Sequence, residues 1–88
     1  MKVILVTGGA GFIGSNLIRF ILNNFNFHVV NVDALTYAGN LDSISDIETN
    51  SRYRFEECNI CDENRIKDIL DKYKPSIVMH LAAESHVD

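Results

Sequence analysis

Short apolar runs alternate with longer amphipathic stretches along this chain of 88 residues. Continuous runs of aliphatic and β-branched residues occupy Lys2–Thr7, His28–Val32 and Ile77–Ala83, a pattern typical of strands buried on both faces of a parallel sheet. Apolar and charged residues alternate in Tyr53–Glu57, which predicts a third strand with the character of a sheet edge.

Two amphipathic helices are expected between these strands. In the first, apolar residues recur at helical spacing before an asparagine cluster (Asn23, Asn24 and Asn26) ends the pattern: Ile13, Leu17, Ile18, Ile21, Leu22 and Phe25. In the second, Asp62 is the expected N-cap, Pro75 ends the helix, and the apolar face comprises Ile66, Ile69, Leu70 and Tyr73. Asp68 and Lys72, four residues apart, are expected to pair.

The remaining segment, residues 34–51, is polar, with a turn signal at Gly39-Asn40 and room for one helical turn near residues 42–47. The resulting order of elements predicts the α/β class: a parallel sheet flanked by helices, with right-handed crossovers and strands in the spatial order 3-2-1-4. Because the last strand is strongly apolar, we expect residues 1–88 to be the N-terminal portion of a longer domain. We also expect this piece alone to self-associate through residues 77–83.

Composition narrows the classes of partner. The chain is 47% hydrophobic and 23% charged, has a net charge of -4, and carries its basic residues singly, so neither nucleic acid nor an anionic membrane is an expected partner. No apolar segment is long enough to span a bilayer, and the N-terminus lacks a signal-peptide pattern, which favours a cytoplasmic protein.

The two cysteines, Cys58 and Cys61, form a lone Cys-x-x-Cys. A redox dithiol is one interpretation of this spacing. The favoured interpretation is structural, with two small side chains at the end of a buried strand. A zinc site is disfavoured and no metal is predicted, because the three histidines do not add ligands at matched spacing.

Gly8, Gly11 and Gly14 lie between the first strand and the first helix. In this context the first glycine permits a tight turn, the second allows close approach of a pyrophosphate, and the third allows the helix to pack against the strand. Free N–H groups at the helix N-terminus then face the phosphate charge. No Lys-Ser or Lys-Thr follows, which excludes the phosphate loop of NTPases.

Asp33 ends the second strand, where a carboxylate accepts hydrogen bonds from the adenosine ribose. It would repel a 2′-phosphate, and neither Ala34 nor Leu35 offers a compensating cation. The sequence therefore predicts an NAD-binding, Rossmann-type domain that prefers NAD to NADP.

Three stretches carry a narrower resemblance. The glycine spacing resembles the extended short-chain dehydrogenase/reductase family, whose members act largely on nucleotide sugars. Within it, "TGGAGFIGSN" (7–16), "LTYAGNL" (35–41) and "HLAAESHVD" (80–88) resemble the dTDP-glucose 4,6-dehydratase family over essentially the whole chain. The resemblance implies NAD as cofactor, dTDP-glucose as substrate, dTDP-4-keto-6-deoxyglucose as product, a role in rhamnose precursor synthesis, and a homodimer.

By position, the resemblance also implies roles for individual residues. Phe12 and Ile13 are expected at the pyrophosphate. The residues expected at the adenosine ribose are Asp33, Ala34, Leu35 and Thr36, and those expected at the adenine are Asn59 and Ile60. Those expected at the nicotinamide ribose are Leu81, Ala82, Ala83 and Glu84, and Ser85 is expected to face both cofactor and sugar. A purely structural core role remains open for Phe12, Ile13, Ile60, Leu81 and Ala82.

The chain departs from that family at two of these positions. The family usually has Lys at the position of Ala34, and Asp at the position of Asn59, whose amide oxygen could still accept from adenine. The family's catalytic Tyr-x-x-x-Lys and carboxylate pair do not occur in these 88 residues, so no catalytic residue is predicted and the piece alone is expected to be inactive. Another nucleotide-sugar epimerase or dehydratase, or a non-catalytic NAD-binding module, remains an alternative.

Overall fold

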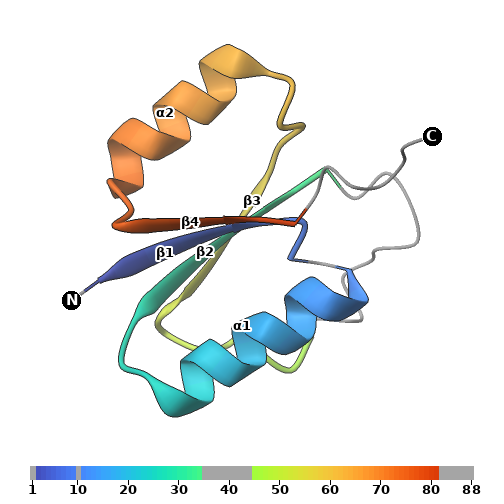
Figure 1. Ribbon diagram of the computed structural model, residues 1–88, viewed down its shortest axis with the longest axis vertical. Helices are drawn as coiled ribbons and strands as arrows, with labels where there is room; N and C mark the ends of the chain where they lie inside the picture. The colour runs from blue at the N-terminus through green and yellow to red at the C-terminus, as the bar shows by residue number, and fades with distance from the viewer. Residues whose placement is uncertain (1, 10, 35–44, 82–88) are drawn as a thin grey trace.

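The computed structural model describes residues 2–9, 11–34 and 45–81, which form a four-stranded sheet with helices on both faces (Figure 1). In chain order the elements are β1 (Val3–Thr7), α1 (Phe12–Asn24), β2 (His28–Asp33), β3 (Tyr53–Glu57), α2 (Glu63–Tyr73) and β4 (Ile77–His80). All three strand pairings are parallel, and the order across the sheet is β3-β2-β1-β4. The predicted fold class and strand order are therefore confirmed.

The two central strands are buried because each face of the sheet carries its own apolar layer. α1 covers one face and α2 the other, as Figure 1 shows. The buried residues on the α1 side are Ile4, Val6, Ile18, Ile21, Leu22, Val29, Ile47 and Tyr53. Those on the α2 side are Leu5, Val30, Val32, Cys58 and Ile69. This burial on both sides explains the continuous apolar runs of β1 and β2.

The apolar stripe expected for α1 is wrong at both of its ends. The buried positions are Gly14, Ser15, Ile18, Ile21 and Leu22, whereas Ile13 and Phe25 are 71% and 47% exposed. Ile13 lies in the first helical turn, ahead of the part of the helix that packs on the sheet. Phe25 follows the last turn and stacks on Phe27, with ring centroids 5.2 Å apart.

The N-cap predicted for α2 is confirmed, since the Asp62 carboxylate accepts from the Arg65 N–H at 3.2 Å. Pro75 would allow the helix to continue to residue 74. The helix ends one residue earlier, at Tyr73, because Lys74 adopts a left-handed conformation with φ 48°.

The expected Asp68–Lys72 pair is replaced by a contact across elements. The Lys72 ammonium lies 3.4 Å from the carboxylate of Glu56 in β3, which also accepts from the Tyr73 hydroxyl at 2.6 Å. The Tyr73 hydrogen bond, helped by Lys72 and Arg65, lowers the pKa of Glu56. These contacts fasten α2 to the edge strand β3.

β4 is shorter than the predicted Ile77–Ala83, because its pairing with β1 ends at Thr7 and His80. Residues 82 and 83 lie outside the described residues. Within the described sheet β4 is an edge, and its Ile77 and Val78 side chains are exposed. Residues 45–49 form turns, while residues 42–44 and the Gly39-Asn40 signal lie outside the described ranges. Among the helices of the described residues, none is both long and apolar enough to cross a membrane.

Candidate functional site

The glycine segment reverses the chain at the carboxyl end of β1, as its sequence predicts. Gly8 has φ 76°, a left-handed conformation that disfavours a side chain, and its N–H donates to the Val32 carbonyl at 2.8 Å. Gly11 is extended, with φ -76°, and its N–H donates back to the Gly8 carbonyl at 3.2 Å. The positive φ therefore explains why Gly8 must be glycine, whereas the conformation of Gly11 does not require one.

Gly14 is needed for the close approach of α1 to this turn. A Cβ atom on Gly14 would lie 2.3 Å from the Gly8 carbonyl oxygen and 2.7 Å from the Gly9 Cα, both of them backbone atoms. The predicted role of the third glycine in close packing is confirmed.

Gly9, which the motif leaves out, is also tightly enclosed. A Cβ there would lie 2.2 Å from the Asn31 amide oxygen and 2.6 Å from the Ile18 Cδ1. The doubled glycine in the sequence was the only signal for this second requirement.

The N-terminus of α1 leaves backbone donors without a side-chain cap. Its N-cap is Gly11, no side chain caps it, and its first turn holds no acidic residue. The N–H groups of Phe12, Ile13 and Gly14 have no intrahelical acceptor and lie at the positive end of the helix dipole. The Phe12 and Ile13 side chains are 82% and 71% exposed, so a core role for these two residues is wrong. Backbone donors at a helix N-terminus are the groups that phosphate ligands bind in many proteins.

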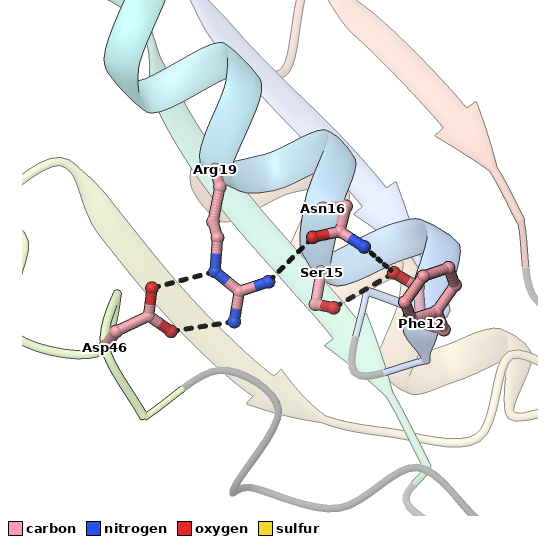
Figure 2. Close-up of polar contacts among 5 residues, drawn as sticks. All are labelled: Phe12, Ser15, Asn16, Arg19 and Asp46. Atoms are coloured by element: carbon pink, nitrogen blue, oxygen red, sulfur yellow. Dashed lines mark hydrogen bonds and ion pairs between the residues drawn. The ribbon is translucent and has the colours of Figure 1, made fainter.

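The Phe12 carbonyl and the side chains of Ser15, Asn16 and Arg19 form a polar network along the first turns of α1 (Figure 2). The Phe12 carbonyl accepts from the Ser15 hydroxyl at 3.1 Å and from the Asn16 amide at 3.0 Å. Arg19 donates to the Asn16 amide oxygen and, through two nitrogens at 2.7 and 2.8 Å, to the Asp46 carboxylate. This network links the helix to the segment that precedes β3.

The ends of β2 and β3 form a second part of the site. Asp33 is buried at the end of β2, and its carbonyl accepts from the Cys58 N–H at 3.1 Å. A cleft of about 320 Å³ opens beside it, lined by Ala34, Glu57, Cys58, Asn59, Asp62 and Arg65. The structure thus brings together Ala34 and Asn59, two predicted site residues distant in the sequence. The Asn59 amide oxygen already accepts from the Cys61 N–H at 2.8 Å, which leaves it one lone pair for a ligand.

Ile60 and Leu81 lie apart from that cleft. Ile60 packs with the α2 side of the core and lines an apolar pocket of about 270 Å³ with Leu5, Ile66, Leu70 and Val78 among others. Leu81 packs against the α1 side. Both side chains therefore pack against the core, which is the structural role that the sequence left open for them.

Thr7 makes a contact next to the glycine turn that sequence reasoning missed. The Leu81 N–H donates to the Thr7 hydroxyl at 3.0 Å, and that hydroxyl is 2.8 Å from the His80 Nδ1. This contact ties the end of β4 to the residue before Gly8. The other predicted site residues, Leu35, Thr36, Ala82, Ala83, Glu84 and Ser85, lie outside the described residues.

The surroundings of the two cysteines do not favour a redox pair. Cys58 is buried, Cys61 is exposed, and neither forms a disulfide. Burial raises the pKa of the Cys58 thiol, the opposite of what a reactive thiolate needs. The structural interpretation is confirmed for Cys58, while Cys61 lies at the surface. Within residues 2–9, 11–34 and 45–81, no cluster of three or more His, Cys, Asp or Glu residues could hold a metal.

Known proteins are similar to this chain in sequence and in fold. The chain is 60% identical over 85 residues to the dTDP-glucose 4,6-dehydratase of Escherichia coli, covering 97% of this chain and 24% of that protein. Among solved structures, the dTDP-glucose 4,6-dehydratase of Bacillus anthracis, in complex with NAD, superposes with a TM-score of 0.91 at 36% identity, over 97% of this chain and 28% of that one. The UDP-Glc/GlcNAc 4-epimerase of Campylobacter jejuni superposes with a TM-score of 0.87 at 29% identity, over 99% and 26%.

The chain thus spans about a quarter of the length of the curated relatives it matches. The family model of the GDP-mannose 4,6 dehydratases matches residues 5–88, which include the glycine turn, both helices and all but the first two residues of β1. The chain belongs to the GDP-mannose 4,6-dehydratase family.

Proposed function

We propose that this chain supplies the diphosphate- and ribose-binding half of an NAD site. The observation that carries the proposal is the uncapped N-terminus of α1, brought against the glycine turn by Gly14. A dinucleotide fits this arrangement, because the helix end offers backbone donors, positive dipole charge and no competing carboxylate. NAD, when bound, is the group that accepts and returns the hydride.

Each of these residues has its own part in binding. Phe12 and Ile13 donate backbone N–H groups to the diphosphate, Asp33 and Ala34 lie at the adenosine ribose, and Asn59 lies at the adenine. The B. anthracis relative, whose structure contains NAD, supports NAD as the ligand of this site. Leu35 and Thr36 at the ribose, Leu81 and the residues 82–84 at the nicotinamide side, and Ser85 at cofactor and sugar remain predictions, as does an adenine contact for Ile60.

The choice of cofactor can be tested at Asp33. In the complete protein, isothermal titration should show NAD binding at least about tenfold more tightly than NADP, because a carboxylate at Asp33 repels the 2′-phosphate. Asp33→Asn should narrow that ratio. Equal affinities for NAD and NADP in the unaltered protein would contradict the ribose role of Asp33.

We further propose that the complete protein is a dTDP-glucose 4,6-dehydratase, which forms dTDP-4-keto-6-deoxyglucose. The support is the 60% identity to the E. coli enzyme of that name. The superposition on the C. jejuni 4-epimerase favours a second candidate, an epimerase acting on a UDP-sugar. Incubating the complete protein with dTDP-glucose and with UDP-glucose separates the two. A 4-keto product from dTDP-glucose supports the dehydratase, whereas epimerised UDP-sugar supports the alternative. If neither product forms, the remaining candidate is a non-catalytic NAD-binding module.

Four expectations about the protein in its cell and its assembly remain predictions: a cytoplasmic location, a role in rhamnose precursor synthesis, a homodimer, and self-association of residues 1–88 alone through strand 77–83. The exposed Ile77 and Val78 on the edge strand β4 support the last of these.

A further inference from the structure

Asn31 is a polar residue in the most apolar part of the sheet. It lies at the middle of β2, between Val30 and Val32, and its exposed fraction is 0%. Burying an amide side chain is unfavourable unless its polar atoms find partners. Both of its polar atoms do: the amide oxygen accepts from the Gly9 N–H at 2.9 Å, and the amide nitrogen donates to the Tyr53 hydroxyl at 3.0 Å.

Chemistry dictates the orientation of this amide. A backbone N–H can only donate, so the atom of Asn31 that faces Gly9 must be the oxygen. The NH2 group then faces Tyr53, whose hydroxyl must accept. Tyr53 is itself buried in β3, so Asn31 bridges the glycine turn and a neighbouring strand across the interior of the fold.

The same bond determines where the glycine turn lies. The Gly8 N–H donates to the Val32 carbonyl and the Gly9 N–H to Asn31, so both donors point into the sheet and away from any ligand. Among the described residues of this segment, the donors left for phosphate oxygens are those of the first turn of α1. Because Gly14 packs on the Gly8 carbonyl and the Gly9 Cα, a shift of the turn would shift the start of that helix.

We propose that Asn31 is a positioning residue for the dinucleotide diphosphate. Its amide oxygen anchors Gly9, and through Gly9 and Gly14 it sets the position of the N-terminus of α1. The inference rests on the proposed function, since a diphosphate at that helix end is what the anchor serves.

Two matched variants of the complete protein separate positioning from core packing. Asn31→Leu keeps the number and branching of the side-chain heavy atoms but removes both hydrogen bonds, whereas Tyr53→Phe removes only the partner of the amide nitrogen. Loss of one anchoring hydrogen bond should weaken NAD binding by about tenfold in Asn31→Leu. Tyr53→Phe should lower Tm while changing the Kd for NAD by less than about twofold. Both Kd values are measured by titration well below each Tm.

An unchanged Kd in Asn31→Leu, or equal losses of affinity in the two variants, would overturn the positioning role. Amide hydrogen exchange of the unaltered protein without NAD provides a test that does not depend on any variant folding. The Gly9 amide should be protected to the same degree as the ladder amides of β1, and fast exchange would refute the anchor. Failure of the unaltered protein to bind NAD would overturn the proposed function, and with it any cofactor role for Asn31, even if the Gly9 amide proved protected.

Discussion

Replacing Gly14 with alanine is expected to destabilise the protein by about 2–4 kcal/mol and to abolish tight NAD binding. The added Cβ would meet the Gly8 carbonyl oxygen at 2.3 Å and the Gly9 Cα at 2.7 Å. Neither atom belongs to a side chain that could rotate away, so α1 must move off the turn. The gain of about 1 kcal/mol in helix propensity does not offset this cost.

Asn23→Ala is the matched control for this substitution. Asn23 is exposed on the same helix, so alanine there gains helix propensity without a new contact. Chemical denaturation gives the free energies of unfolding of both variants, and titration gives their affinities for NAD. If Gly14→Ala were as stable as Asn23→Ala, the close packing of the helix on the glycine turn would be refuted.

Ile69→Ala should cost about 3 kcal/mol, the second largest effect expected. Ile69 is the buried residue of α2, at 1% exposure, and it packs with Leu5, Val30 and Val32 of the sheet. Truncation would leave a cavity under a helix whose other apolar side chains are only partly buried. Because α2 leads from the cleft at Asn59 into β4, its docking also places one wall of the candidate site.

The adjacent Leu70→Ala provides the comparison, since Leu70 is 38% exposed and should cost less than about 1 kcal/mol. Thermal denaturation of the two variants under identical conditions measures the difference. Similar losses of Tm would show that α2 is not held mainly by Ile69.

The features that could be predicted from sequence are those that local physics determines. The continuous valine and isoleucine runs predict the central strands, and Asp62 predicts a helix start because its carboxylate reaches an N–H only three residues on. The glycine spacing, placed between a strand and a helix, predicts the turn and the open helix end.

The features that were missed depend on residues far apart in sequence. The helical periodicity predicts that Ile13 is buried. In the structure Ile13 is exposed, because it lies at a helix end where the sheet no longer covers it. The i, i+4 rule paired Lys72 with Asp68, but a carboxylate from β3 is its partner in the structure. Neither the Asn31–Gly9 bond nor the Thr7–Leu81 bond has a local signal, because each joins residues that only the folded sheet brings together.

The measurement that tests the account most directly is a crystal structure of the complete protein with NAD. The account predicts diphosphate oxygens within about 3.2 Å of the Phe12 and Ile13 backbone nitrogens, with the Gly9 N–H still donating to Asn31. A diphosphate bound away from the N-terminus of α1, or one that takes the Gly9 N–H from Asn31, would contradict it.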